Sequence, residues 1–244
     1  FWEDWTASGH TGDAIPTMFP VRGLRHDRVP LEPDGRLGYF ALAAETAITA
    51  GTWKAASAAA AIAQTGQRLV AGGSPVAFGL CRPPGHHASS DQFGGYCFLN
   101  NAAIAAEGFL VDGADRVAVL DIDFHHGNGT QDVFYGDDRV LFVSCHQWPL
   151  YPGTGAADEV GTGVGVGTTI NVPLPPGAAG DDYRHVMGSV VVPAVERFAP
   201  DWLLVSAGFD AHRADPLTDM GLTSADYADL VVELVGLVPT GRVV

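Results

Sequence analysis

Residues 117–130, VAVLDIDFHHGNGT, constrain the fold more than any other part of the chain. The stretch begins with four consecutive apolar residues, the pattern of a strand buried on both faces of a parallel sheet. Asp123 and His125 follow at alternate positions, so their side chains share one face and can converge just beyond the strand. Ligand sites in open α/β sheets lie at the carboxyl ends of strands, and a carboxylate beside an imidazole suits zinc. The stretch therefore predicts a metal site at a strand end.

Strand-like and helix-like segments alternate along the chain. Strands are expected at residues 76–80, 117–120, 140–144, 169–172 and 202–207, and helices at residues 52–64, 99–109, 131–135, 182–198 and 224–235. Thr52 and Ser224 are the predicted N-caps of two of these helices. The alternation predicts an α/β fold of three layers, with a mostly parallel sheet and helices on both faces. Residues 1–38 lack periodicity and are expected to form a long surface loop with a short helix.

Charge and cysteine content narrow the class of partner and the cellular location. The chain carries 28 acidic and 13 basic residues, which disfavours nucleic acid as a partner and favours a small cationic ligand. Three cysteines without a CxxC pair indicate reduced thiols and predict a cytoplasmic protein. The sequence shows neither a signal peptide nor an apolar run that would span a membrane.

Polar clusters follow three of the predicted strands. His86 and His87 follow one strand on a loop stiffened by two prolines, and Asp210 follows another. Because the carboxyl ends of parallel strands meet at one edge, Asp210 can join Asp123 and His125 as a third metal ligand. Three protein ligands leave a position open for water, which is typical of a catalytic zinc. The histidine pair is suited to taking and giving protons beside that ion.

Six motifs together resemble the histone deacetylase superfamily, whose fold is arginase-like: RPPGHH, GGYCFLNNAA, LDIDFHHGNGTQD, VSCH, YPGTG and SAGFD. Within that superfamily, GDAIPTMFPVR and GRLGYFALAAETAITAGTWKAA are similar to segments of the bacterial acetylpolyamine amidohydrolases. The resemblance implies a zinc-dependent hydrolase that removes acetyl groups from acetylated putrescine, spermidine and related amines.

The resemblance also implies roles for the polar residues at the strand ends. It implies one zinc ion per chain, with the ligands Asp123, His125 and Asp210. His87 resembles the general base, and His86 resembles its electrostatic partner. Asp121 resembles the carboxylate behind His86, and Asn128 stands behind His87 where many relatives carry aspartate, so the proton affinity of His87 should be raised less. Asp121 and Ser144 match a structural monovalent-cation site, which predicts a potassium ion.

Substrate contacts are implied for a further group of residues. Gly95 resembles the residue whose backbone carbonyl receives the substrate amide N–H. Tyr96 and Tyr151 resemble the aromatic walls of the tunnel for the acyl chain. Glu45, in an apolar and alanine-rich surrounding, is expected to bind the charged amine of the substrate, with assistance from Asp34.

The resemblance places residues 1–38 at the rim of the active site and in a homodimer contact, with residues 39–244 as the catalytic core. The family's transition-state donor is a tyrosine in a Gly-Gly-Tyr segment that this sequence does not contain. We therefore expect a single deacetylase domain that is truncated at both ends and lacks its C-terminal part. Three alternatives follow: a protein lysine deacetylase, a catalytically impaired acetyl-amine binding protein, and an arginase-like dimanganese ureohydrolase.

Overall fold

A parallel sheet forms the centre of the computed structural model, which describes residues 1–20 and 27–244. In this part of the chain the strands lie in the order β3-β2-β1-β4, with bounds Val117–Asp121 (β1), Val140–Gln147 (β2), Thr169–Leu174 (β3) and Trp202–Ser206 (β4). Asp121 at the end of β1 is directly opposite Ser144 in β2 and Ser206 in β4. The residues that follow β1 and β4 therefore leave the sheet at the same level.

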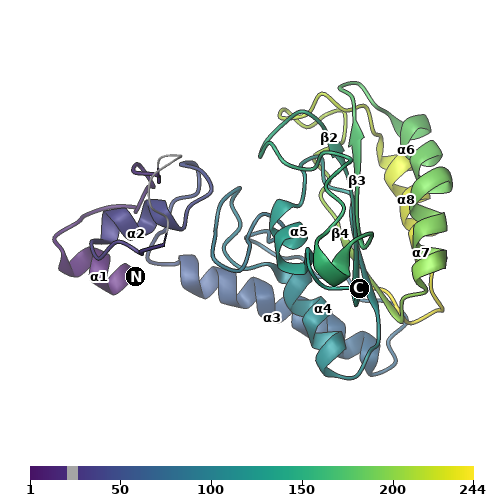
Figure 1. Ribbon diagram of the computed structural model, residues 1–244, viewed down its shortest axis with the longest axis horizontal. Coiled ribbons are helices and arrows are strands. Elements are labelled where there is room, and N and C mark those ends of the chain that lie inside the picture. The colour runs from purple at the N-terminus through teal and green to yellow at the C-terminus, as the bar shows by residue number, and fades with distance from the viewer. Residues whose placement is uncertain (21–26) are drawn as a thin grey trace.

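Helices cover both faces of the sheet (Figure 1). One face carries α3 (Thr52–Ala71), α4 (Asn101–Val111) and α5 (Asn128–Phe134), and the other carries α6 (Gly180–Val186), α7 (Val192–Phe198) and α8 (Ser224–Val235). Val117 and Val119 belong to the apolar core between the sheet and α4, whereas Ala118 and Leu120 belong to the apolar core between the sheet and α6, α7 and α8. This alternation explains why β1 is apolar from Val117 to Leu120, and it confirms the three-layer α/β fold expected from the sequence.

The first part of the chain stands apart from the sheet, at one end of the molecule (Figure 1). It contains two helices, α1 (Trp2–Ala7) and α2 (Pro33–Tyr39), where we expected a long loop with a short helix. Trp5 and Leu37 bury themselves in a small core with Ala14, and Phe93 packs against that core. These apolar contacts give the segment its own order. Residues 21–26, which belong to the expected rim loop, lie outside the described residues.

The strand expected at residues 76–80 does not form in the described structure. Its apolar side chains are instead exposed, by 52% for Val76, 69% for Phe78 and 79% for Leu80. The Ala77 N–H donates to the carbonyl of Val243, and Val243 in turn pairs with Leu203 of β4. Val243 thus forms an isolated parallel bridge beside β4. The described structure joins residues 76–80 to this edge by the Ala77 hydrogen bond and not by a strand ladder.

The helix boundaries differ from those expected in ways that hydrogen bonding explains. The N-cap of α8 is Thr223 and not Ser224, because Thr223 and Asp226 bond reciprocally to each other's backbone N–H. Thr52 begins α3 rather than capping it, and its hydroxyl accepts from the Thr49 N–H. The helix expected at residues 182–198 contains a π turn, Met187–Val191, which is separated from Pro193 by Val192, and Pro193 has no N–H to donate. No described helix is long and apolar enough to cross a membrane.

Candidate active site

Three side chains suited to a metal ion converge beyond the ends of β1 and β4. Asp123, His125 and Asp210 each offer a ligand atom, and these atoms lie within 4.8 Å of one another. The Asp210 carboxylate is held there by the Phe124 N–H at 2.9 Å and by Nδ1 of His125 at 2.9 Å. Burial lowers the pKa of His125, but the hydrogen bonds and charges of the two carboxylates outweigh it and raise that pKa to about 9. The two carboxylates thus favour positive charge at this point, and their oxygen and nitrogen donors fit zinc.

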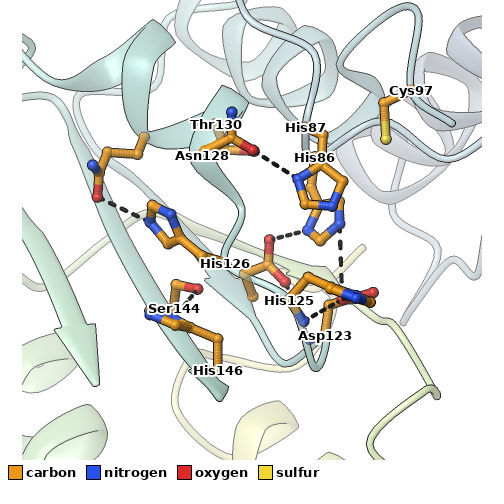
Figure 2. Close-up of polar contacts among 12 residues, drawn as sticks. His86, His87, Cys97, Asp123, His125, His126, Asn128, Thr130, Ser144 and His146 are labelled. Atoms are coloured by element: carbon orange, nitrogen blue, oxygen red, sulfur yellow. Dashed lines mark hydrogen bonds and ion pairs between the residues drawn. The ribbon is translucent and has the colours of Figure 1, made fainter. Parts of the chain in front are cut away.

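The two adjacent histidines lie beside this triad, each with its own partner (Figure 2). Nδ1 of His86 donates to the Asp121 carboxylate at 3.0 Å, and Nδ1 of His87 donates to the Asn128 side-chain oxygen at 2.7 Å. The two imidazole rings are 4.1 Å apart, and the ring of His87 is 5.9 Å from that of His125. The structure therefore brings the predicted base, its neighbour and their two predicted partners into one cluster.

The two histidines differ in charge because their surroundings differ. Burial lowers the pKa of His86, but the charges of Asp123 and Asp121 outweigh it and raise that pKa to about 9. Burial and the charge of His86 lower the pKa of His87 to about 2, against the opposing hydrogen bond to Asn128. The carboxylates thus favour the charged form of His86, whereas burial and the neighbouring charge favour the neutral form of His87. Because Nδ1 of His87 carries the proton, its Nε2 keeps a lone pair that can accept a proton.

A tight turn and an aromatic ring enclose the histidine pair. Gly95 has φ +55°, and a Cβ at this position would lie 2.1 Å from Cδ2 of His87, so the ring packs directly on the glycine backbone. The ring of Tyr151 meets those of His87 and His125 edge-on, at centroid distances of 5.2 and 6.1 Å. The side chain of Tyr96 is 57% exposed, so its predicted part in the tunnel wall stays a prediction.

Of the two predicted amine-binding carboxylates, only Glu45 contacts these residues in the described structure. Its Oε1 accepts from the Gly95 N–H at 3.0 Å and from the Tyr151 hydroxyl at 3.4 Å. Asp34 lies on α2 and pairs with Nε2 of His10 at 3.0 Å. The joint action of the two carboxylates on one amine therefore stays a prediction.

To one side of Asp123 and His125 lies a second, fully buried pair of histidines, His126 and His146, with rings 4.7 Å apart (Figure 2). Ser144, one of the two residues of the predicted potassium site, donates its hydroxyl proton to Nδ1 of His146 at 2.9 Å. Asp121, the other residue, accepts from the Asp123 N–H at 3.1 Å and from His86.

Sequence reasoning missed a group of polar residues around this second pair. They hold the loop of residues 151–167, which carries Tyr151: Gln131, Thr154, Glu159 and Asn171. Gln131 and Thr154 lie within the LDIDFHHGNGTQD and YPGTG motifs, but nothing in those motifs connects them to Glu159 or Asn171. Only the fold brings the four residues together.

The fold and the site define an α/β protein of the arginase and deacetylase type, with three side chains suited to a metal ion at the strand ends and a buried histidine pair. A family model described as histone deacetylase domain matches residues 21–244. The chain therefore belongs to the histone deacetylase family.

Individual relatives narrow the similarity within this family. Acetylpolyamine amidohydrolase 1 of Pseudomonas aeruginosa is 49% identical over 93% of the chain and 66% of its own length. Acetylpolyamine amidohydrolase of Mycoplana ramosa is 47% identical over 93% of the chain and 67% of its own length. A crystal structure of acetylpolyamine aminohydrolase from Burkholderia pseudomallei matches 93% of the chain and 66% of that structure, with a TM-score of 0.86 and 37% identity. The chain thus spans about two thirds of the length of these relatives.

Proposed function

We propose that this protein is a zinc-dependent amidohydrolase that removes the acetyl group from N-acetylated polyamines. Two relatives that match 93% of the chain are named for this activity. The observation that carries the substrate assignment is the position of Glu45. Its carboxylate is exposed and bonds to Gly95 and Tyr151, the two residues that pack on His87. A negative charge at that distance from the proton-transfer group suits an amide whose far end is an ammonium.

Zinc is supported by the chemistry of the converging side chains. Asp123, His125 and Asp210 would hold the ion, and each supplies an oxygen or nitrogen atom of the type that zinc prefers. When bound, zinc polarises a carbonyl and makes water a competent nucleophile at neutral pH.

The histidine pair would manage the proton during hydrolysis. Nε2 of neutral His87 accepts a proton from the water that attacks the acetyl carbonyl. The same proton passes to the amide nitrogen as the C–N bond breaks, which gives acetic acid and a free amine. These products exchange one proton at neutral pH and leave as acetate and an ammonium. His86 remains cationic through its bond to Asp121, and its charge keeps His87 from holding the proton in the resting state.

We also propose three finer features, each on its own support. A potassium ion is proposed at Asp121 and Ser144. The two residues are opposite each other in the register of β1 and β2, and the Ser144 hydroxyl donates its proton to His146, so its oxygen can accept a cation. A homodimer through the N-terminal segment is proposed on the exposed side chains of Ile15, Met18 and Leu31. A cytoplasmic location is proposed because Cys81, Cys97 and Cys145 are free thiols.

The substrate assignment is tested by Glu45→Gln, which removes the charge and keeps the shape. We expect kcat/KM for an acetylpolyamine to fall roughly 10–100-fold, because a charge-assisted contact contributes on the order of 1.5–3 kcal/mol. Hydrolysis of a neutral acetamide of similar length should barely change. Glu107→Gln, an equivalent change at an exposed residue of α4, serves as the matched control. Equal losses on charged and neutral substrates would remove Glu45 from amine recognition and, with it, the polyamine assignment.

A further inference from the structure

The loop of residues 151–167 is held from within by one carboxylate. Oε1 of Glu159 accepts from the backbone N–H groups of Gly155 and Ala156, both at 3.0 Å. Oε2 of the same carboxylate accepts from the side-chain amide of Gln131, on α5, at 2.6 Å. Burial raises the pKa of Glu159, but these hydrogen bonds outweigh it and keep that pKa below its ordinary value of 4.5. Glu159 is therefore an anion that joins the loop to the body of the protein.

Gln131 is the point where this connection enters the core, and its orientation is fixed by its neighbours. Its side-chain oxygen accepts from Nε2 of His126 at 3.1 Å and from the side-chain amide of Asn171 at 2.7 Å. Its NH₂ group therefore faces Glu159, where only an acceptor can satisfy it. Asn171 lies on β3 and also donates to the Glu159 carbonyl at 3.1 Å. Three segments far apart in the sequence thus share one chain of hydrogen bonds.

The loop of residues 151–167 packs on the second histidine pair, His126 and His146. The Thr154 hydroxyl donates to Nδ1 of His126 at 2.8 Å, and Nε2 of His146 donates to the Gly155 carbonyl at 3.0 Å. Gly155 has φ +93°, and a Cβ there would lie 2.4 Å from Nε2 of His146 and 2.7 Å from Cγ of His126. The loop therefore lies directly on the two rings, and these contacts together hold residues 154–156 in place.

Tyr151 lies three residues before Thr154 in the same loop, and its ring forms part of the candidate active site. We infer that Glu159 is a positioning residue: by fixing residues 154–156 it sets where the Tyr151 ring packs against His87 and where its hydroxyl meets Glu45. The carboxylate of Glu159 contacts Gln131 and the loop backbone, and it contacts none of the candidate active-site residues. Glu159 therefore acts through Tyr151 and not on the reacting atoms. The consequence for substrate binding rests on the proposed function, whereas the consequence for Tyr151 does not.

The donor and acceptor pattern allows a swap experiment on the full chain. Glu159→Gln places two amide donors face to face, and Gln131→Glu places two carboxylates face to face. The double variant restores one donor and one acceptor, with their positions exchanged. Asp158→Asn is the matched control, because it removes the same charge from an exposed neighbouring residue of the same loop.

The first measurement is ¹⁹F NMR of protein labelled with 3-fluorotyrosine, with the Tyr151 signal assigned by Tyr151→Phe. We expect each single variant to shift or broaden the Tyr151 signal and to leave the signals of Tyr183 and Tyr227, which belong to the core behind α6 and α8, in place. Amide exchange at Gly155 and Ala156 should quicken about tenfold, the change that loss of roughly 1.4 kcal/mol of protection produces. The double variant should return both observables toward the wild type. An unmoved Tyr151 signal in Glu159→Gln, or a double variant as perturbed as the single ones, would overturn the inference.

The second measurement separates binding from chemistry. For an acetylpolyamine we expect Glu159→Gln to raise KM about tenfold and to change kcat less than threefold, since His87 keeps its partner Asn128. The double variant should recover KM, and Asp158→Asn should match the wild type. Equal loss of kcat in Glu159→Gln and its double variant would mean a general structural role. A wild-type chain that does not hydrolyse acetylpolyamines would overturn the proposed function alone, because the NMR measurement still decides the role of Glu159.

Discussion

Two buried pairs of histidines lie near the end of β1, and they have opposite chemical character (Figure 2). Their rings are similarly close, at 4.1 Å for His86 and His87 and 4.7 Å for His126 and His146. Carboxylates adjoin the first pair and raise the pKa of His86 to about 9. The second pair bonds to hydroxyl, amide and carbonyl groups, and burial lowers the pKa of both rings, that of His126 to about 3. Burial without a nearby carboxylate partner therefore favours a neutral histidine, whereas carboxylates beside the first pair favour a charged one, which suits the proton transfer that we propose for it.

Removing a carboxylate should affect only the first pair. Asp210→Ala leaves two of the three proposed zinc ligands, and we expect zinc affinity to fall by more than about 100-fold, because even losses behind the ligands cost 10–100-fold. Elemental analysis after dialysis gives the zinc content, with Asp219→Ala as an exposed control on the same segment. Unchanged zinc in Asp210→Ala would reject the proposed ligand set.

Substitutions in the two pairs should have different effects, one on the rate of hydrolysis and the other on the stability of the fold. His87→Ala should lower kcat on an acetylpolyamine by roughly 10²–10⁴ with zinc retained, because it removes the proposed proton acceptor. His126→Ala should instead lower the free energy of unfolding by roughly 2–4 kcal/mol, since it opens a cavity and removes one of the two donors to the Gln131 side-chain oxygen. Steady-state kinetics and urea unfolding of both variants give the two quantities. The comparison breaks if the variants lose rate and stability in the same proportion.

Two glycines of the same loop test how much its packing on His126 and His146 contributes to stability. Gly155→Ala should destabilise the protein by roughly 2–4 kcal/mol, because it combines a left-handed φ with a Cβ forced into His126 and His146. Gly153→Ala carries the same backbone penalty at φ +96° but meets no atom within 4 Å. The difference between the two in thermal unfolding isolates the contact with the rings. Equal shifts in Tm would show that the His126 and His146 rings move aside at no cost, which would contradict the predicted contact.

The smallest expected effect is a pH dependence at the second pair. Because the folded pKa of Glu159 lies below 4.5, its contribution to stability is fully present above pH 4.5 and is lost as pH falls through that folded pKa. Solvent screens this partly exposed group, so we expect at most about 1 kcal/mol. Urea unfolding of the wild type and Glu159→Gln should show a constant difference at neutral pH that shrinks below pH 4.5. A difference that grows on acidification would contradict the assigned charge.

The sequence predicted those features whose signal lies within a few residues. β1 and the residues after it were identified because an apolar run leads directly into Asp123 and His125. The same reasoning was wrong for residues 76–80, because apolar character alone does not show whether a segment pairs with a neighbouring strand. It could not connect Glu159, Gln131 and Asn171, which lie 28 and 40 positions apart along the chain and meet only through the packing of α5 and β3. Local patterns show which chemistry is present, whereas the support behind it depends on long-range contacts.

The pairing of β1 with β4 has a consequence for how the protein assembles. His125 and Asp210 are 85 positions apart in the chain, yet their side chains touch. Synthesis releases the N-terminal part first, so Asp123 and His125 leave the ribosome well before Asp210. Pairings between distant segments form slowly, and the set of three donors is complete only when β4 docks along β1. Firm capture of the metal would thus mark a late stage of folding, and a nascent chain that has not yet placed β4 would hold the ion with two donors at most.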